Sequence, residues 1–147
     1  MKLFNILKNL ASKCNKNLQE AKDYTDELVE FEDLSSQVIS GTAQLTLNTS
    51  WVRCYRIGNL LYMTVEGTFT ANQSQAVSLP LAYIPLKVDK ILAGAGTING
   101  SGYARIDYTT ESDGRQWLKQ GWANTPTSGQ ILSVWAILHI AEGGGNN

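Results

Sequence analysis

Residues 51–66 read WVRCYRIGNLLYMTVE, and this stretch decides the fold class. Two runs of alternating apolar and polar residues flank Gly58-Asn59. A two-residue link of this composition accepts the positive φ angles that tight hairpin turns demand, so we expect a β-hairpin. Pairing across the turn sets Cys54 opposite Met63 and Val52 opposite Val65, on an apolar face that we expect to enter the core.

The second face of this hairpin is amphipathic and rich in aromatic area. The same register sets Tyr55 opposite Tyr62, Arg53 opposite Thr64, and Trp51 opposite Glu66. We interpret this face as a subunit interface or a covered surface, because it carries too much aromatic area to lie freely in water.

Further short strands are expected on both sides of the hairpin, with turn residues between them: Ala43–Leu47, Leu92–Ile98, Tyr103–Tyr108, Arg115–Trp122 and Ile131–Ile140. Many short strands with polar turns and no helix between them are typical of an antiparallel β-sandwich. We therefore expect a mainly β fold, with a jelly-roll-like sandwich head over residues 40–142 and a flexible glycine-rich tail over residues 143–147.

The strand expected at Ile131–Ile140 is apolar on both faces. The residues at its even positions are apolar and are expected in the core. The odd positions Ile131, Trp135 and Ile137 are nearly as apolar. The pattern predicts a strand that is buried on both faces. In so small a domain, we expect neighbouring subunits to cover one side of it.

Residues 1–38 show a helical period instead. Apolar or small residues fall alternately four and three apart, which is a heptad seam: Leu3, Leu7, Leu10, Cys14, Asn17, Ala21, Tyr24, Leu28, Phe31, Ser35 and Val38. No glycine or proline occurs before Gly41. We expect an N-terminal coiled-coil stalk over residues 1–39. The alternative is a single helix packed on its own β domain.

The seam and the charges suggest how the stalk is used. Tyr24 and Phe31 are bulky for a tight dimer, so we predict a homotrimer. Residues 1–16 hold four lysines and no acid, whereas residues 20–33 hold seven acids. This order opposes the helix dipole. It fits a basic tip that docks into an acidic socket, or a solvated face without a partner.

Composition excludes several classes of protein. The chain has 147 residues, 43% hydrophobic and 17% charged, with a net charge of −1, so it is globular and has no charge excess for nucleic acid. We expect no membrane insertion, because no apolar stretch is long enough. We also expect synthesis in the cytoplasm without processing. Cys14 and Cys54 are expected to be small buried residues.

The residues offer little for catalysis, and we expect no catalytic residue, no cofactor and no metal. The chain holds one histidine, His139, and no motif for a nucleophile, a phosphate loop or a metalloprotease. The enzymatic alternative is a polysaccharide hydrolase that uses paired carboxylates among Asp107, Glu111 and Asp113. Acids in a hairpin loop are more often turn formers.

Two phrases in the sequence resemble appendage proteins of tailed bacteriophages. Residues 20–27, EAKDYTDE, resemble the "AKxYTD" helical phrase of tail-fibre proteins, which commonly precedes a trimeric C-terminal head. Residues 78–85, SLPLAYIP, resemble the "LPxGYRP" phrase of those heads, with Ala82 in place of glycine and Ile84 in place of arginine. The hairpin Val52–Thr70 precedes the second phrase, as is usual in such heads.

This resemblance implies a homotrimeric fibre or spike in the virion, on tail or capsid. Its N-terminal helix would contact other virion proteins, and its head would bind a host cell-surface glycan or protein receptor. The alternative is a purely structural capsid or baseplate decoration protein.

A ligand site is expected at the loops of the hairpin formed by Tyr103–Tyr108 and Arg115–Trp122. Trp122 would offer a stacking platform, and Asp113 and Arg115 would hold polar groups of the ligand. Other aromatic residues expected at this surface are Tyr103, Tyr108 and Trp117. The alternative for each aromatic is packing in the core or in a subunit interface.

Overall fold

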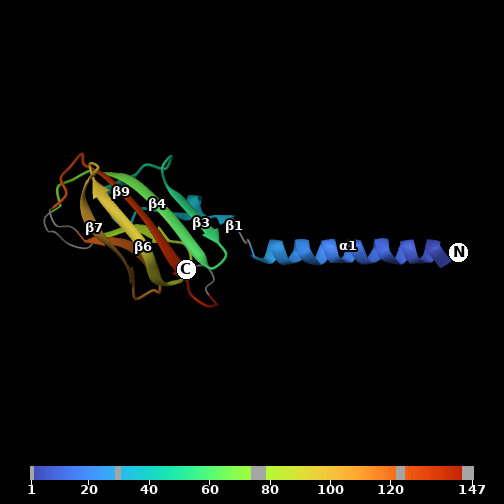
Figure 1. The fold of residues 1–147 in the computed structure, drawn as a ribbon. Helices are drawn as coiled ribbons and strands as arrows, with labels where there is room; N and C mark the ends of the chain where they lie inside the picture. Colours follow the sequence, from blue (N-terminus) through green and yellow to red (C-terminus); the bar gives the residue numbers. More distant parts are fainter. Residues whose placement is uncertain (1, 29–30, 74–78, 122–124, 144–147) are drawn as a thin grey trace. The chain divides into compact units, whose positions relative to one another are not determined.

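The chain divides into two compact units in the computed structural model, residues 1–30 and residues 31–147. The structure describes residues 2–28, 31–73, 79–121 and 125–143 (Figure 1). The first unit is one helix and the second is built from strands. Of the expected tail over residues 143–147, only Gly143 is among the described residues. Trp122 lies outside them.

The N-terminal unit is helix α1, Lys2–Leu28. Its sequence has no glycine or proline, and its apolar residues recur at helical spacing. The helix expected over residues 1–38 is therefore confirmed only as far as Leu28. Cys14, which we expected to be buried, is exposed in the single chain.

Residues beyond the helix join the β unit, which corrects the end of the predicted stalk helix. Strand β1, Phe31–Asp33, pairs with a neighbouring strand, and a 3-10 turn, Ser35–Gln37, follows it. The Asp33 Oδ1 atom accepts hydrogen bonds from the Ser35 N–H group and hydroxyl, at 3.0 and 2.6 Å, which favours a turn over a helix. Leu34 and Val38 are buried in the β core. Tertiary pairing and burial override the heptad spacing here.

Eight more strands complete the unit: β2 Leu45–Leu47, β3 Arg53–Ile57, β4 Leu60–Phe69, β5 Leu79–Ile84, β6 Val88–Ile98, β7 Ser101–Thr110, β8 Gln116–Gly121 and β9 Ile131–Ile140. Every pairing between the described strands is antiparallel, in the order β1-β3-β4-β9-β6-β7-β8-β5, with β2 beside β4. The prediction of a mainly β fold with antiparallel strands and one N-terminal helix is confirmed.

The individual strands follow the sequence pattern closely, with some shifts. The last strand has the predicted bounds, and the hairpin pairs Cys54 with Met63 and Tyr55 with Tyr62 as predicted. β6 starts four residues earlier than predicted, and β2 is two residues shorter than predicted. β7 is two residues longer at each end, and β8 is one residue shorter at each end. β5 was not predicted as a strand. It holds Pro80 beside a β-bulge, at the end of the sheet order where a missing N–H group is tolerated.

One segment bridges the two ends of the strand order. β1 pairs with β3, and the residues that follow reach β5 at the opposite end: the Gly41 N–H group donates to the Leu81 carbonyl and the Tyr83 N–H group to the Ile39 carbonyl, both at 2.9 Å. A Cβ atom on Gly41 would lie 2.6 Å from the Pro80 carbonyl oxygen. Glycine therefore permits this close approach of two backbones.

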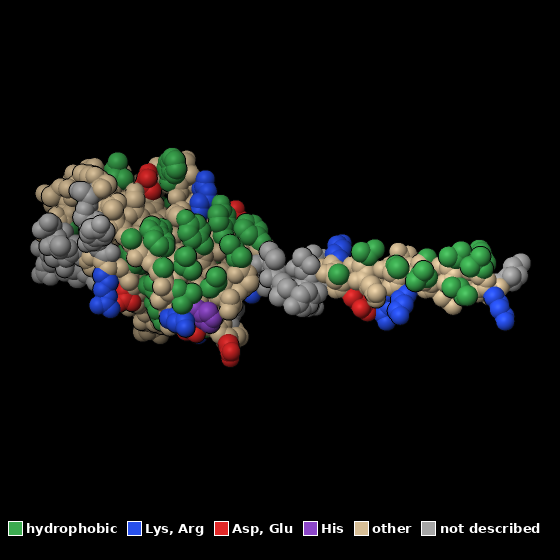
Figure 2. Space-filling view, in the orientation of Figure 1, with side chains coloured by type: hydrophobic (Ala, Val, Ile, Leu, Met, Phe, Trp, Pro, Cys, Tyr) green, Lys and Arg blue, Asp and Glu red, His purple; other side chains and the backbone are tan. Residues whose placement is uncertain are grey.

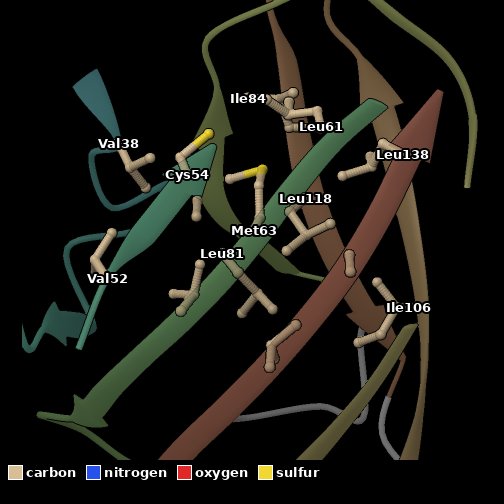
Figure 3. Packing of buried hydrophobic residues seen from close by; sticks show 14 of the residues in the cluster. Val38, Val52, Cys54, Leu61, Met63, Leu81, Ile84, Ile106, Leu118 and Leu138 are labelled. Atoms are coloured by element: carbon tan, nitrogen blue, oxygen red, sulfur yellow. The ribbon is translucent and has the colours of Figure 1, made fainter. Parts of the chain in front are cut away.

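The core lies inside this arrangement (Figure 3). Buried side chains of β3, β4 and β9, such as Cys54, Met63 and Leu138, point toward those of β5 and β8, such as Leu81 and Leu118. The even positions of β9 are all buried, as expected: Leu132, Val134, Ala136, Leu138 and Ile140.

The other face of β9 is partly exposed in the single chain. Ile131 and Trp135 are 46% and 41% exposed, so within a single chain the strand is buried on one face only. The odd side chains lie on the side of the sheet away from the core. Cover by neighbouring subunits stays a prediction.

A buried glutamine ties β8 to the start of β6. Gln116 accepts a hydrogen bond from the Val88 N–H group at 2.7 Å and donates to the Val88 carbonyl at 2.9 Å. Its amide thus pairs with a backbone peptide as a neighbouring strand would.

Candidate functional site

The predicted loop site is only partly described. Asp113 and Arg115 lie in the turn between β7 and β8. There the Asp113 Oδ1 atom accepts the Arg115 N–H group at 3.0 Å, and Asp113 Oδ2 lies 3.1 Å from Arg115 Nε. β8 ends at Gly121, roughly 17 Å along the strand from this turn. Trp122 lies outside the described residues, so its role as a stacking platform stays a prediction.

One neighbouring expectation is corrected. Trp117, expected among the surface aromatics, is only 8% exposed, because the ring of Tyr83 on β5 packs edge-on against it at 5.4 Å between ring centroids. Pro126, in the segment after β8, is buried, and its carbonyl accepts a hydrogen bond from the Gln73 N–H group, whereas Thr125, Thr127, Ser128 and Gly129 around it are exposed. Tyr108 is half-buried, and its hydroxyl donates to the Asp89 carbonyl at 2.8 Å.

A second candidate site lies on the outer face of the sheet, which we define as the side of β1, β3, β4, β9 and β6 that points away from the core. Hydrophobic side chains gather on this face (Figure 2). Part of the face forms a groove of about 550 Å³, which we call the outer-face groove. Its lining residues are Trp51, Arg53, Tyr62, Thr64, Val65, Glu66, Ala95, Gly96, Thr97, Ser133, Val134 and Trp135.

Strand register explains why these residues meet. Thr64 on β4 pairs with Arg53 on β3 and with Trp135 on β9, and Trp135 pairs in turn with Ala95 on β6. One row of four residues therefore crosses the groove. A second row holds Glu66, Ser133 and Thr97.

Two indoles belong to this groove. Trp51 is 64% exposed and Trp135 is 41% exposed. The Thr64 hydroxyl donates to the Trp51 carbonyl at 3.3 Å, which connects the segment before β3 to the row that holds Trp135. Because β3 and β9 lie on either side of β4, their backbones are about 10 Å apart. Trp51, just before β3, and Trp135 on β9 thus lie on either side of Thr64 on β4.

The charges in the groove are held in place by hydrogen bonds. Arg53 Nη1 donates to the Val52 carbonyl at 2.7 Å, and the Glu66 Oε1 atom accepts from the Asn48 amide at 3.0 Å. One cation and one anion leave the groove with no net charge. The hydroxyls of Thr64, Thr97 and Ser133 add groups that can both donate and accept.

Beside the groove, aromatic and aliphatic side chains gather on the outer face, and Tyr62 belongs both to this group and to the groove lining. The rings of Phe31, Tyr55 and Tyr62 follow one another across β1, β3 and β4, with centroids 5.5 and 6.5 Å apart. Ile57 and Leu60 are exposed beside them. We call these five residues the aromatic row. From the sequence we interpreted the second face of the hairpin as a subunit interface or a covered surface. For the aromatic row, this interpretation remains a prediction.

His139 lies at the edge of the outer face. Its Nδ1 atom lies 2.8 Å from Asp89 Oδ1, and its Nε2 atom lies 3.3 Å from the Asn59 amide nitrogen. Both ring nitrogens thus have partners within the chain. Among the described residues, no group of three or more His, Cys, Asp or Glu side chains could hold a metal ion.

The sequence contained a signal for half of the groove. Trp51, Arg53, Tyr62, Thr64 and Glu66 were identified as one amphipathic face from the hairpin register. Trp135, Ser133 and Thr97 were not connected to that face, because only the pairings β4–β9 and β9–β6 bring them there.

Comparison with known proteins adds little. No protein-family model matches the sequence, and no curated protein matches it. A solved structure with a partial likeness is the crystal structure of the KRT10-binding region domain of the pneumococcal serine-rich repeat protein PsrP. It is 13% identical, the alignment covers 77% of this chain and 81% of that chain, and the TM-score is 0.34. A likeness at this level carries no argument about function.

In the part of the chain that the structure describes, no helix is both long enough and apolar enough to span a membrane.

Proposed function

We propose that this chain is a non-enzymatic fibre or spike protein of a tailed-bacteriophage virion. In this proposal α1 forms a trimeric coiled-coil stalk that attaches to other virion proteins, and the β unit is a sandwich head that binds a host-surface receptor. The support from the sequence is the resemblance of residues 20–27 and 78–85 to phrases of phage appendage proteins, in the order usual for that family.

The observation that carries the proposal is the exposed apolar side of α1. Leu3, Leu7 and Leu10 of the heptad seam are 70%, 55% and 56% exposed in the single chain. Three apolar residues beside the seam are exposed as well: Phe4, Ile6 and Leu18. Burying a leucine or phenylalanine stabilises a protein by about 1.5–3 kcal/mol, so a helix with this surface is expected to bind other helices.

The width of the apolar side favours three strands over two. Phe4 and Leu18 each follow a seam position directly, so the apolar stripe is wider than the seam alone. A trimer core covers more of each helix than a dimer core does, and it has room for the bulky Tyr24. Second copies of this chain are the partners that the proposal assigns to this surface.

The test is the mass of the purified full chain by light scattering. We expect about three times the 16.1 kDa of one chain at micromolar concentration. Leu10→Asp in the seam should give a monomer, because it places a charge in the core. Asn9→Asp, which adds the same charge on the neighbouring polar position, should stay trimeric. A monomeric wild-type chain would refute the stalk, and a dimer would refute the choice of three strands.

Receptor binding has a separate test. Labelled trimer should bind host cells, and the trimer should compete with intact particles for attachment. Trimer that assembles into particles but binds no cells would favour the purely structural decoration protein. Shortened polysaccharide chains after incubation with the head would favour a hydrolase.

A further inference from the structure

The outer-face groove has the size and lining of a small-ligand site. Its volume of about 550 Å³ falls within the range of roughly 300–1,000 Å³ that is usual for such sites. It combines large aromatic surfaces with a few placed polar groups, which is the composition that fixes and orients a small molecule. The question is which chemical class of ligand fits it.

The floor of the groove allows a ligand to lie flat between the indoles. On this face β4 presents Thr64 between Trp51 and Trp135, and the floor continues past Trp135 with the short side chains of Ser133 on β9 and of Ala95 and Thr97 on β6. Trp51 and Trp135 are exposed enough to offer ring faces to a ligand without unfolding any element. An aromatic face carries negative electrostatic potential and attracts the polarised C–H groups of a flat, partly apolar ring.

The polar groups complement this ligand shape. Arg53 donates only, Glu66 accepts only, and the three hydroxyls of the floor do both. A ligand with hydroxyls around its edge and C–H groups on its faces would satisfy both kinds of surface. Because Arg53 and Glu66 balance each other, the groove offers no excess charge to a polyanion.

A second copy of this chain fits the groove less well than it fits the aromatic row. The cores of protein–protein interfaces are depleted in charged residues. The groove holds Arg53 and Glu66, whereas the aromatic row holds Phe31, Ile57 and Leu60 without a charge. The outer face therefore divides into an apolar half suited to subunit contact and a mixed half suited to a polar ligand.

We infer that the outer-face groove binds a short neutral oligosaccharide, with Trp51 and Trp135 stacking on sugar rings and Arg53, Glu66 and the floor hydroxyls binding their hydroxyl groups. This inference rests on the proposed function, since it names the receptor class and moves the site from the loops of β7 and β8 to the outer face of β3, β4, β9 and β6.

The experiment uses the full chain and a defined panel of oligosaccharides. The panel contains neutral oligomers of glucose, galactose and N-acetylglucosamine, and oligogalacturonate as an acidic comparison. Binding is measured by calorimetry and by protection of tryptophan fluorescence from acrylamide. We expect a neutral oligomer to bind and to protect the fluorescence, since Trp51 and Trp135 are among the chain's four tryptophans. No binding by any neutral oligomer at millimolar concentration overturns the inference, as does preferential binding of oligogalacturonate.

Three variants test the location. Trp51→Ala and Trp135→Ala should each weaken binding about tenfold or more, the loss expected when an aromatic anchor is removed. Phe31→Ala removes an aromatic side chain outside the groove that is about as exposed as Trp51, and it should leave affinity unchanged. Wild-type affinity in both tryptophan variants would place the ligand elsewhere. A change in oligomeric mass in those variants would make the groove a subunit interface instead.

Cell binding separates this inference from the proposed function. If Trp51→Ala and Trp135→Ala together leave attachment to host cells intact, the groove assignment fails and the fibre function stands. If the wild-type trimer binds no cells, the receptor-binding function itself fails. Binding of a neutral oligosaccharide in that second case would still support the groove.

Discussion

Two buried glutamines of β8 should respond in opposite ways to the same substitution. Gln116 and Gln120 lie four residues apart on one face of the strand and are 4% and 0% exposed. The Gln116 amide bonds to both backbone groups of Val88 and donates to the Thr110 hydroxyl at 3.2 Å. The Gln120 amide oxygen and nitrogen are buried without a hydrogen-bond partner among the described residues.

The expected magnitudes follow from this difference. A buried polar group without a partner costs about 1–3 kcal/mol, whereas an apolar side chain of similar shape avoids that cost. Gln120→Met should therefore raise the free energy of unfolding by about 1–3 kcal/mol. Gln116→Met should lower it by about 2–4 kcal/mol, because the Val88 N–H and carbonyl groups lose their partner inside the protein.

Methionine is chosen to replace Gln120 because of the way this side chain packs against β6. A Cβ atom on Gly96 would lie 2.7 Å from Gln120 Nε2, so the amide fills the space that glycine leaves. Methionine has a similar volume and enough flexibility to occupy the same space. A bulkier or β-branched residue would test packing rather than hydrogen bonding.

Urea unfolding followed by circular dichroism measures both variants against wild type. The samples must have equal chain concentration, because an oligomer gains stability with concentration. Equal destabilisation by Gln120→Met and Gln116→Met would refute the reasoning. It would show that the Gln120 amide is satisfied in solution, for example by an enclosed water molecule.

Three other outcomes are expected. Deleting residues 1–16 should leave a folded β unit that no longer joins particles, and normal incorporation would refute the anchor. Gly41→Ala should lower the free energy of unfolding by about 1–3 kcal/mol, because the new Cβ atom would lie 2.6 Å from the Pro80 carbonyl oxygen. Gly121→Ala should leave the thermal melt nearly unchanged, because a Cβ atom there meets nothing within 4 Å. Burial, with a smaller contribution from the Asp33 charge, raises the pKa of Cys54 from 9.0 to about 12. The unfolded thiol ionises first, so the stability that Cys54 contributes should fall as pH rises from 9 to 12, and thiol reagents at pH 8 should leave Cys54 unmodified until urea unfolds the chain.

Local sequence patterns determined the parts of this protein that depend on near neighbours. The Gly58-Asn59 link and the alternation around it predict the β3–β4 hairpin with its register, and Gly58 has a φ of +59°. The alternation in Ile131–Ile140 predicts β9 and its buried face. Helical spacing predicts α1, because apolar residues recur three and four positions apart along this segment.

Only the tertiary structure decided what distant segments do together. The heptad spacing of Phe31, Ser35 and Val38 fits a helix, yet pairing of β1 with β3 and burial of Val38 place this segment in the β unit. The ring of Tyr83 packs against Trp117, which is therefore buried and not available to a ligand. The groove exists because β9 pairs between β4 and β6, which joins Trp135 to hairpin residues far earlier in the chain, such as Arg53 and Thr64, and to Ala95 of β6. Which strands pair depends on which sheet edges are still unpaired and which apolar faces are still exposed in the rest of the fold. No local sequence pattern contains that information.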